Sequence, residues 1–338
     1  MIPDDVLRAV DYAVLGVSGL GFLLCLAGAL LAVPWRSALR QPATRELSVF
    51  WRARIALQVS GALWLLAQWL RLFALWGPGS RIMPARVTRW SRNGLLCRAY
   101  LCVSLGLLQP FFLLVALLLC RSALSRARPE RGMWPNAWVA AVAFAGAMPL
   151  LAAVAVVAWL GALLPGAHLE VTRSQLPSLF FAAFLAEDAP RCGPPAGRTC
   201  ALCVFPAATC IATGVFALAY AIALGATTRA MARAAINKRL RRRVLTFQAA
   251  TLSLLAAQQA LQAATLAGAP GGWLFQLLWA ACFAAQAALV ATVCTSLVVR
   301  PVLDALDASS NLGASPALLG SWSGQPPTAG APAAAKGA

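Results

Sequence analysis

Hydrophobic residues fall into seven continuous blocks that are separated by short polar segments. Each block reaches the length of about 20 residues that an α-helix needs to cross the hydrocarbon layer of a bilayer. Polar and apolar residues do not alternate within the blocks, so they predict helices rather than barrel strands. The sequence therefore predicts an all-α polytopic transmembrane bundle of seven helices, with spans at Tyr12–Val33, Ile55–Trp76, Leu95–Cys120, Ala137–Leu164, Ala201–Leu224, Leu245–Ala267 and Trp273–Val299.

The pattern divides the chain into three regions. Residues 1–11 form a short N-terminus, residues 12–300 hold the seven-helix domain, and residues 301–338 form a tail rich in Gly, Ala, Ser and Pro. Such a tail buries little apolar surface and is predicted to be disordered and cytosolic. The first block is a full-length span without a basic segment before it, so we expect it to be retained rather than cleaved as a leader.

Composition supports the membrane assignment and suggests an orientation. The 338 residues are 61% hydrophobic and 11% charged, against about 45 to 50% and about 25% in soluble domains. The loops after spans one, three and five, together with the tail, hold 18 of the 28 basic residues. The positive-inside rule then places the N-terminus outside or in a lumen, in a multi-pass protein of the plasma membrane or an endomembrane. Four arginines between spans two and three favour the opposite orientation.

The formal net charge of +18 is divided among short loops next to the membrane, which favours anionic lipid headgroups rather than nucleic acid as partner. The densest basic run extends from Arg229 to Arg243. One interpretation is a topology determinant that rests on headgroups. The other is a docking surface for a cytosolic signalling partner on helical extensions of spans five and six, formed by Lys238, Arg239, Arg241, Arg242 and Arg243.

The seven blocks contain no Asp, Glu, Lys or His. Proton-coupled transport, intramembrane aspartyl proteolysis and retinal or haem ligation all need such groups at bilayer depth. The single histidine, His168, falls in the loop after span four. We therefore expect no enzymatic activity, no cofactor and no metal.

Two cations do fall inside the predicted spans. Arg71 lies near the outer end of span two, and Arg98 lies near the outer start of span three. Each side chain either extends to the headgroups or turns inward, and two inward arginines would form a basic floor beneath an outer vestibule.

Glutamines provide further polarity. Gln248, Gln259 and Gln262 share one face of span six, because a helix turns about 100° per residue. This stripe predicts either hydrogen bonds between helices or, if it converges with the arginines, a polar cavity. The candidate ligand-binding residues are Arg71, Arg98, Gln68, Gln109, Gln259, Gln262 and Gln276.

Ten cysteines occur, four of them on or near the predicted outer face: Cys97, Cys192, Cys200 and Cys203. An oxidising exterior favours one disulfide. Cys97 with Cys192 or Cys200 would tie the long second outer loop over the bundle, whereas Cys192 with Cys200 would close a local loop. Spacing alone leaves the connectivity open. The Cys200-x-x-Cys203 pair has no second pair or nearby histidine, so we do not expect zinc.

The outer half of the chain has a familiar arrangement. Its features are seven predicted spans, an outer N-terminus, a cysteine-bearing second outer loop, and Trp90, Gly94 and Cys97 around the start of span three. With these features the chain resembles the G-protein-coupled receptor plan over about residues 10 to 300. The resemblance is one of topology, and it implies a ligand site in the outer half of the bundle.

The signature motifs of that receptor family are replaced. Span three ends in Cys120, Arg121 and Ser122 instead of an acidic-arginine-aromatic triplet. Span six lacks Cys-Trp-x-Pro, and span seven ends in SLVVRPV from Ser296 to Val302 instead of Asn-Pro-x-x-Tyr. The resemblance therefore does not extend to G-protein activation, and coupling to a G protein is left open by the sequence.

The leading hypothesis is a non-enzymatic, receptor-like seven-transmembrane protein that binds a small molecule or lipid in the outer half of the bundle. One alternative is a facilitative transporter or channel for a polar or anionic solute. The other is a membrane scaffold whose small-residue helix faces hold it in a homo-oligomer.

Overall fold

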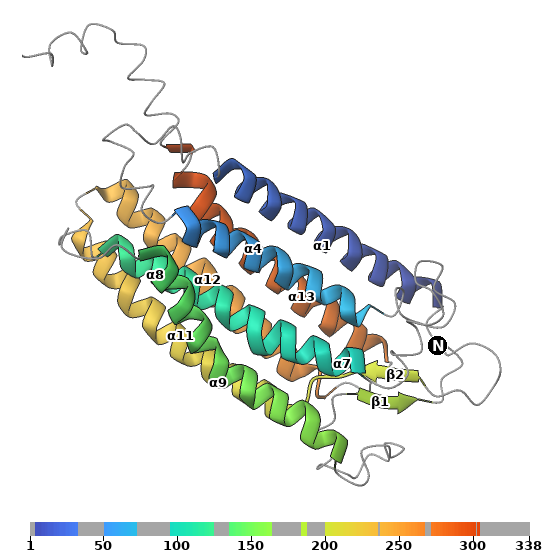
Figure 1. The fold of residues 1–338 in the computed structure, drawn as a ribbon. Coiled ribbons are helices and arrows are strands. Elements are labelled where there is room, and N and C mark those ends of the chain that lie inside the picture. The colour runs from blue at the N-terminus through green and yellow to red at the C-terminus, as the bar shows by residue number, and fades with distance from the viewer. Residues whose placement is uncertain are drawn as a thin grey trace, which may run out of the picture.

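The computed structural model describes residues 4–32, 51–72, 95–124, 135–163, 184–187, 200–235, 237–267, 272–301 and 303–304. Long helices run side by side along one axis (Figure 1). In chain order they are α1 (Asp4–Ala32), α4 (Trp51–Ala67) with the 3-10 helix η1 (Gln68–Arg71), α7 (Leu95–Tyr100) with the π-helix η2 (Leu101–Leu108) and α8 (Gln109–Leu124), α9 (Pro135–Leu163), α11 (Ala207–Ala234), α12 (Lys238–Ala264), and α13 (Trp273–Cys294) with the π-helix η5 (Thr295–Val299).

Among the described residues, six helices are long and apolar enough to cross a bilayer: Ala9–Leu30, Leu95–Arg121, Trp138–Trp159, Ala207–Ala234, Lys238–Ala264 and Trp273–Val299. The prediction of a multi-pass helical membrane protein is confirmed to that extent. The predicted span Ile55–Trp76 corresponds to α4, which has 17 residues and continues as η1 up to Arg71. Its crossing of the membrane, and with it the count of seven, stays a prediction.

The predicted start of the fifth span is wrong. Residues 200–203 form the strand β2 (Cys200–Cys203), which pairs antiparallel with β1 (Phe184–Glu187) in a two-stranded sheet. The helix α11 begins only at Ala207, after Pro206 at φ −61°. A short apolar run does not distinguish a strand from a helix, and proline suits the start of a helix because it has no N–H to satisfy. At its other end α11 extends to Ala234, beyond the predicted Leu224.

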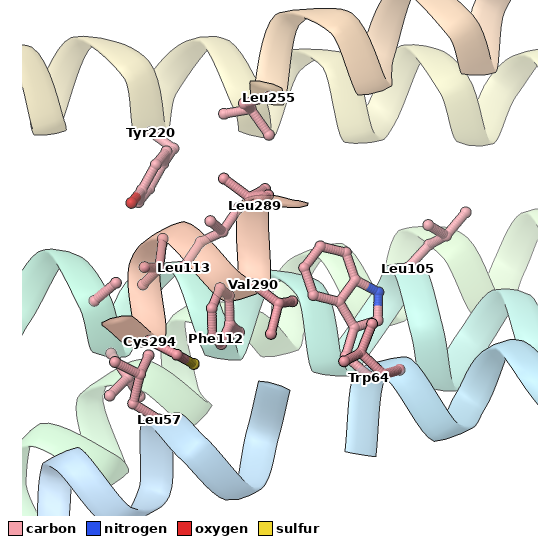
Figure 2. Packing of buried hydrophobic residues seen from close by; sticks show 14 of the residues in the cluster. Leu57, Trp64, Leu105, Phe112, Leu113, Tyr220, Leu255, Leu289, Val290 and Cys294 are labelled. Atoms are coloured by element: carbon pink, nitrogen blue, oxygen red, sulfur yellow. The ribbon is translucent and has the colours of Figure 1, made fainter. Parts of the chain in front are cut away.

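A buried apolar core holds the helices together. Figure 2 shows Trp64 and Leu57 of α4 facing Phe112 and Leu113 of α8 and Leu289 of α13. The rings of Trp64 and Phe112 are tilted, with centroids 5.7 Å apart. Large apolar side chains on outward faces remain exposed, as expected where helices meet lipid: Leu20, Leu24, Val215, Leu218 and Ile222.

One glycine allows two helices to approach closely. A Cβ added to Gly106 of η2 would lie 3.1 Å from Cδ1 of Leu151 and 3.2 Å from its Cα, on α9. The second contact is with backbone, which cannot rotate away as a side-chain tip can. Gly106 therefore sets how near α9 packs to the third helical segment.

The sheet lies at one end of the bundle, which we call the hairpin end (Figure 1). The C-terminal residues of η1 and the first residues of α7 and α13 reach the same end. Residues needed for a site there come from segments far apart in the sequence.

Candidate functional site

Arg71, the last residue of η1, is enclosed by aromatic rings at the hairpin end. Its guanidinium carbon lies 4.5 Å from the ring centroid of Phe205, 4.8 Å from Trp279, 5.7 Å from Phe275 and 5.8 Å from Tyr100. These distances allow cation–π attraction. The 3-10 helix turns the side chain into the bundle, so the inward interpretation of Arg71 matches the structure.

The hydrogen bonds of Arg71 are incomplete. Its Nη2 donates to the carbonyl oxygen of Cys203 at 3.2 Å, while its buried Nη1 has no hydrogen-bond partner. In the described ranges no carboxylate lies within ion-pair distance of this guanidinium. An arginine side chain stays charged in a protein, so a positive charge with free donors lies beneath the sheet.

A hydrogen-bonded network lies behind the aromatic rings. The hydroxyl of Tyr100 donates to Oε1 of Gln68 at 3.0 Å. Nε2 of Gln68 and Nε1 of Trp64 each donate to Oγ of Ser104 at 3.2 Å. All four side chains are buried. The network therefore ties α4 and η1 to α7 and η2 and orients the Tyr100 ring that faces Arg71.

A disulfide holds the sheet against this site. It joins Cys97 of α7 to Cys203 of β2, 106 residues later, with a Cα–Cα distance of 5.2 Å. Of the alternatives left open by the sequence, a bridge from Cys97 to the second outer loop is confirmed, but neither partner considered for it is the one used: Cys200 is at the far end of the same strand, and Cys192 lies outside the described residues. Pairing of β2 with β1 places Cys203 next to α7, which spacing could not show.

Arg98 does not join Arg71, so the predicted floor of two arginines is wrong. Its guanidinium carbon lies 5.4 Å from the ring centroid of Trp159 on α9. That ring is 52% exposed, and Arg98 is half-buried beside it, on the side of α7 that faces α9. On α7, Arg98 follows the buried Cys97 by one residue, and the turn of about 100° directs it away from the interior.

The glutamine stripe of α12 mostly bonds to α11. Oε1 of Gln248 accepts from Thr228 at 2.8 Å, and Oε1 of Gln259 accepts from Thr213 at 3.3 Å. The interpretation as hydrogen bonds between helices is confirmed for these two. Gln276 is half-buried on α13, one residue after Phe275, so it leaves the helix in another direction from the ring that faces Arg71.

Other glutamines are buried with unpaired amide atoms. Gln109 and Gln262, both predicted as ligand-binding, are 1% and 0% exposed. In each residue both side-chain amide atoms, Oε1 and Nε2, lack a hydrogen-bond partner. Gln258 of α12, which sequence reasoning missed, also has no partner at either amide atom, and Gln286 of α13 has none at Oε1. The missed signal is helical spacing, because Gln258 lies one turn from Gln262 on the buried face of α12.

The opposite end of the bundle is basic. The predicted helical extensions are confirmed, because α11 continues to Ala234 and α12 begins at Lys238. Asn237 caps α12 by accepting from the backbone N–H of Arg239 at 2.8 Å. Arg243 pairs with Asp304 at 2.7 Å. Four further cationic side chains of the candidate partner surface are exposed: Lys238, Arg239, Arg241 and Arg242.

Residues 5–312 match the model of the family described as uncharacterised conserved protein UCP031277. Because this match covers most of the 338 residues, the chain belongs to that family. No curated protein and no solved structure matches the chain. The family description names no activity, so the function must be argued from the residues themselves.

Proposed function

We propose that this protein is a non-enzymatic, receptor-like membrane protein that binds a small molecule or lipid through an anionic group at Arg71. The observation that carries the proposal is the buried Nη1 of Arg71, which has no hydrogen-bond partner and, among the described residues, no carboxylate within ion-pair distance. Removing a charge from water is costly unless it is paired. A carboxylate or phosphate of a ligand would supply both the counter-charge and the acceptor oxygens.

The surroundings of Arg71 favour recognition over plain structural support. Four aromatic rings restrict the guanidinium, and the carbonyl of Cys203 takes only one side of its donor fork. A rigid fork with free donors loses little further freedom when an anion binds. Apolar rings would also contact the non-polar part of a ligand.

In this proposal α4 and η1 form a seventh span, and the hairpin end faces outside or a lumen. The bias of basic residues supports that orientation. The Cys97–Cys203 disulfide also supports it, since disulfides persist on oxidising faces. The ligand site then lies in the outer half of the bundle.

The basic end would face the cytosol. Its exposed Lys238, Arg239, Arg241 and Arg242 extend from the start of α12, where anionic headgroups attract each cation by about 1 kcal/mol. Released from lipid, the same surface would be available to a cytosolic signalling partner.

Arg71→Leu tests the site, and Arg98→Leu is its matched control, because both remove one guanidinium at the hairpin end. The purified full chain in nanodiscs of zwitterionic lipid is titrated with octanoate and octyl phosphate, and thermal unfolding is recorded. Both anions should stabilise the wild type and Arg98→Leu. Losing one charge-assisted contact of about 1.5 to 3 kcal/mol should weaken binding to Arg71→Leu by about tenfold to a hundredfold.

Octanol serves as the uncharged probe of equal chain length and should not distinguish the variants. If neither anion shifts the unfolding midpoint of the wild type, or if Arg71→Leu responds as the wild type does, the proposal is wrong. Unfolding midpoints without ligand show whether each variant remains folded.

The second candidate is a facilitative channel or carrier for a polar or anionic solute. The buried, unpaired amides of Gln109, Gln258, Gln262 and Gln286 favour it, because a polar solute could bond to them along a path. Solute flux in proteoliposomes separates the two candidates, since a receptor gives none. A scaffold is the least supported, because its arginines would face lipid, whereas Arg71 lies among rings inside the bundle.

A further inference from the structure

Besides Gln58 of α4, whose Oε1 has no hydrogen-bond partner, four buried glutamines keep unpaired amide atoms: Gln109, Gln258, Gln262 and Gln286. None is more than 2% exposed. Both amide atoms lack partners in Gln109, Gln258 and Gln262. In Gln286 the Oε1 atom lacks one, and Nε2 has only the sulfur of Cys282, at 4.0 Å. Buried polar groups are nearly always hydrogen-bonded, so this concentration needs an explanation.

Three of these glutamines lie where α12 packs against α13. Sγ of Cys282 donates to the backbone oxygen of Gln258 at 3.7 Å, and it also accepts from Nε2 of Gln286. Gln262 lies one turn from Gln258 on the same buried face of α12. Cys282 therefore contacts Gln258 through the backbone oxygen of that residue and Gln286 through its side chain, which places both glutamines next to this thiol.

Gln109 of α8 lies at a similar depth. Phe112 and Val290 both border Gly61, because a Cβ on that glycine would lie 3.2 Å from Phe112 and 3.0 Å from Val290. The helices α8 and α13 both run away from the hairpin end (Figure 1). Gln109 precedes Phe112 by three residues and Gln286 precedes Val290 by four. Both amides thus lie about one turn nearer the hairpin end than this contact.

The amide group continues the site at Arg71. Trp279 contacts the Arg71 guanidinium at 4.8 Å, and Cys282 and Gln286 follow on the same buried face of α13. With a rise of 1.5 Å per residue, Gln286 lies about 10 Å further along the axis than Trp279. A charged end and an uncharged polar end are therefore separated by roughly the length of a small molecule.

We propose that the four glutamines form a subsite for an uncharged polar group that offers both hydrogen-bond donors and acceptors, such as a carboxamide. The inference rests on the proposed ligand-binding function of Arg71 and specifies its ligand: about 10 Å long, with an anionic end at Arg71 and a neutral polar end at the amides. The group contains no charge, so a bound ion would lose its hydration without compensation. An apolar group would leave the amide atoms unpaired.

Two native cysteines of α13 provide the reporter and its control. Cys282 lies among the amides, whereas Cys294 packs against Leu57 and Val290 in the apolar core (Figure 2). Both thiols are buried. The full chain in nanodiscs is treated with methyl methanethiosulfonate, whose sulfenyl sulfur is attacked by the thiolate with release of methanesulfinate. Mass spectrometry of peptides then gives the labelling rate of each thiol.

Cys282 should react at least about tenfold faster than Cys294. Such a ratio corresponds to an activation barrier for labelling that is lower by about 1.4 kcal/mol at Cys282. Acetamide should slow the labelling of Cys282. N,N-dimethylacetamide, which has no N–H donor, should slow it less. Equal protection by the two, or no protection, overturns the proposal, as does equal labelling of the two thiols.

The double variant Gln258→Leu, Gln286→Leu should lose protection by acetamide, and retained protection would also overturn the proposal. Arg71→Leu should keep it, because the charge is not part of the amide group. Failure of anion binding at Arg71 appears in the octanoate titration and failure of the subsite appears in the acetamide assay, so the two failures are distinguishable. Unfolding midpoints confirm that each variant used is folded.

Discussion

Removing one hydroxyl group should destabilise the bundle beneath Arg71. Ser104 is 0% exposed, and its Oγ accepts from Nε1 of Trp64 and from Nε2 of Gln68, each at 3.2 Å. Ser104→Ala leaves the indole donor unpaired and leaves Gln68 with a longer bond of 3.4 Å to the carbonyl of Trp64. Hydrogen bonds between membrane helices average about 0.6 kcal/mol and reach about 1.7 kcal/mol, so two lost bonds predict about 1 to 3 kcal/mol.

The assay is equilibrium unfolding of the purified protein in mixed micelles with increasing denaturing detergent. Ser253→Ala is the matched control, because Ser253 is exposed on α12 and donates only to the carbonyl of Ala250. Alanine is the better helix former, so the control measures the gain from propensity, a few tenths of a kcal/mol. The reasoning is refuted if Ser104→Ala is no less stable than Ser253→Ala.

A double-mutant cycle with Ser104→Ala isolates the hydrogen bond between Trp64 of α4 and Ser104 of η2. Trp64→Phe removes the indole donor while keeping an aromatic ring against Phe112. The free energies of unfolding of the two single variants and the double variant should show a coupling energy of about 0.6 kcal/mol or more. A coupling near zero would mean that the 3.2 Å contact contributes nothing to stability.

Two further predictions concern packing and the sheet. Gly106→Ala should destabilise by about 1 to 3 kcal/mol, because its Cβ meets the Leu151 backbone. A Cβ added at Gly16 meets no atom within 4 Å, so Gly16→Ala should stabilise the protein by up to about 1 kcal/mol. If unfolding titrations show Gly106→Ala to be more stable than Gly16→Ala, the packing argument is contradicted. Cys97→Ser frees β2, so proteases should cut near residue 203 faster than in wild type, and an unchanged cleavage rate would show that the disulfide does not hold the sheet.

Much of the helical framework could be predicted, because in a bilayer each apolar segment must satisfy its own backbone hydrogen bonds. The last predicted span, Trp273–Val299, agrees with α13 and η5 to the residue. The helical face of Gln248 and Gln259 could also be predicted, since periodicity depends only on the turn of the helix. The strand at Cys200–Cys203 could not, because an extended segment is defined by its partner strand.

The two arginines show where prediction from the chain ends. Arg71 and Arg98 are the same residue type at the same end of the bundle, yet one meets four rings and the other meets Trp159 at the surface. Hydropathy describes how a whole segment partitions between water and lipid, so it predicts that both arginines lie near the end of a span but not which way each side chain points. The direction of a side chain depends on the 3-10 turn that presents it and on the helices that surround it.

The sequence by itself determined a membrane protein of apolar helices with a basic end, because length, apolarity and charge act locally on each segment. Tertiary structure alone decided that Cys203 bridges Cys97, that Arg71 is enclosed beneath the sheet, and that Gln258 and Gln286 join Gln109 and Gln262 in the interior. These are relations between residues far apart in the chain. They exist only once the helices pack, because packing selects which polar atoms find partners and which do not.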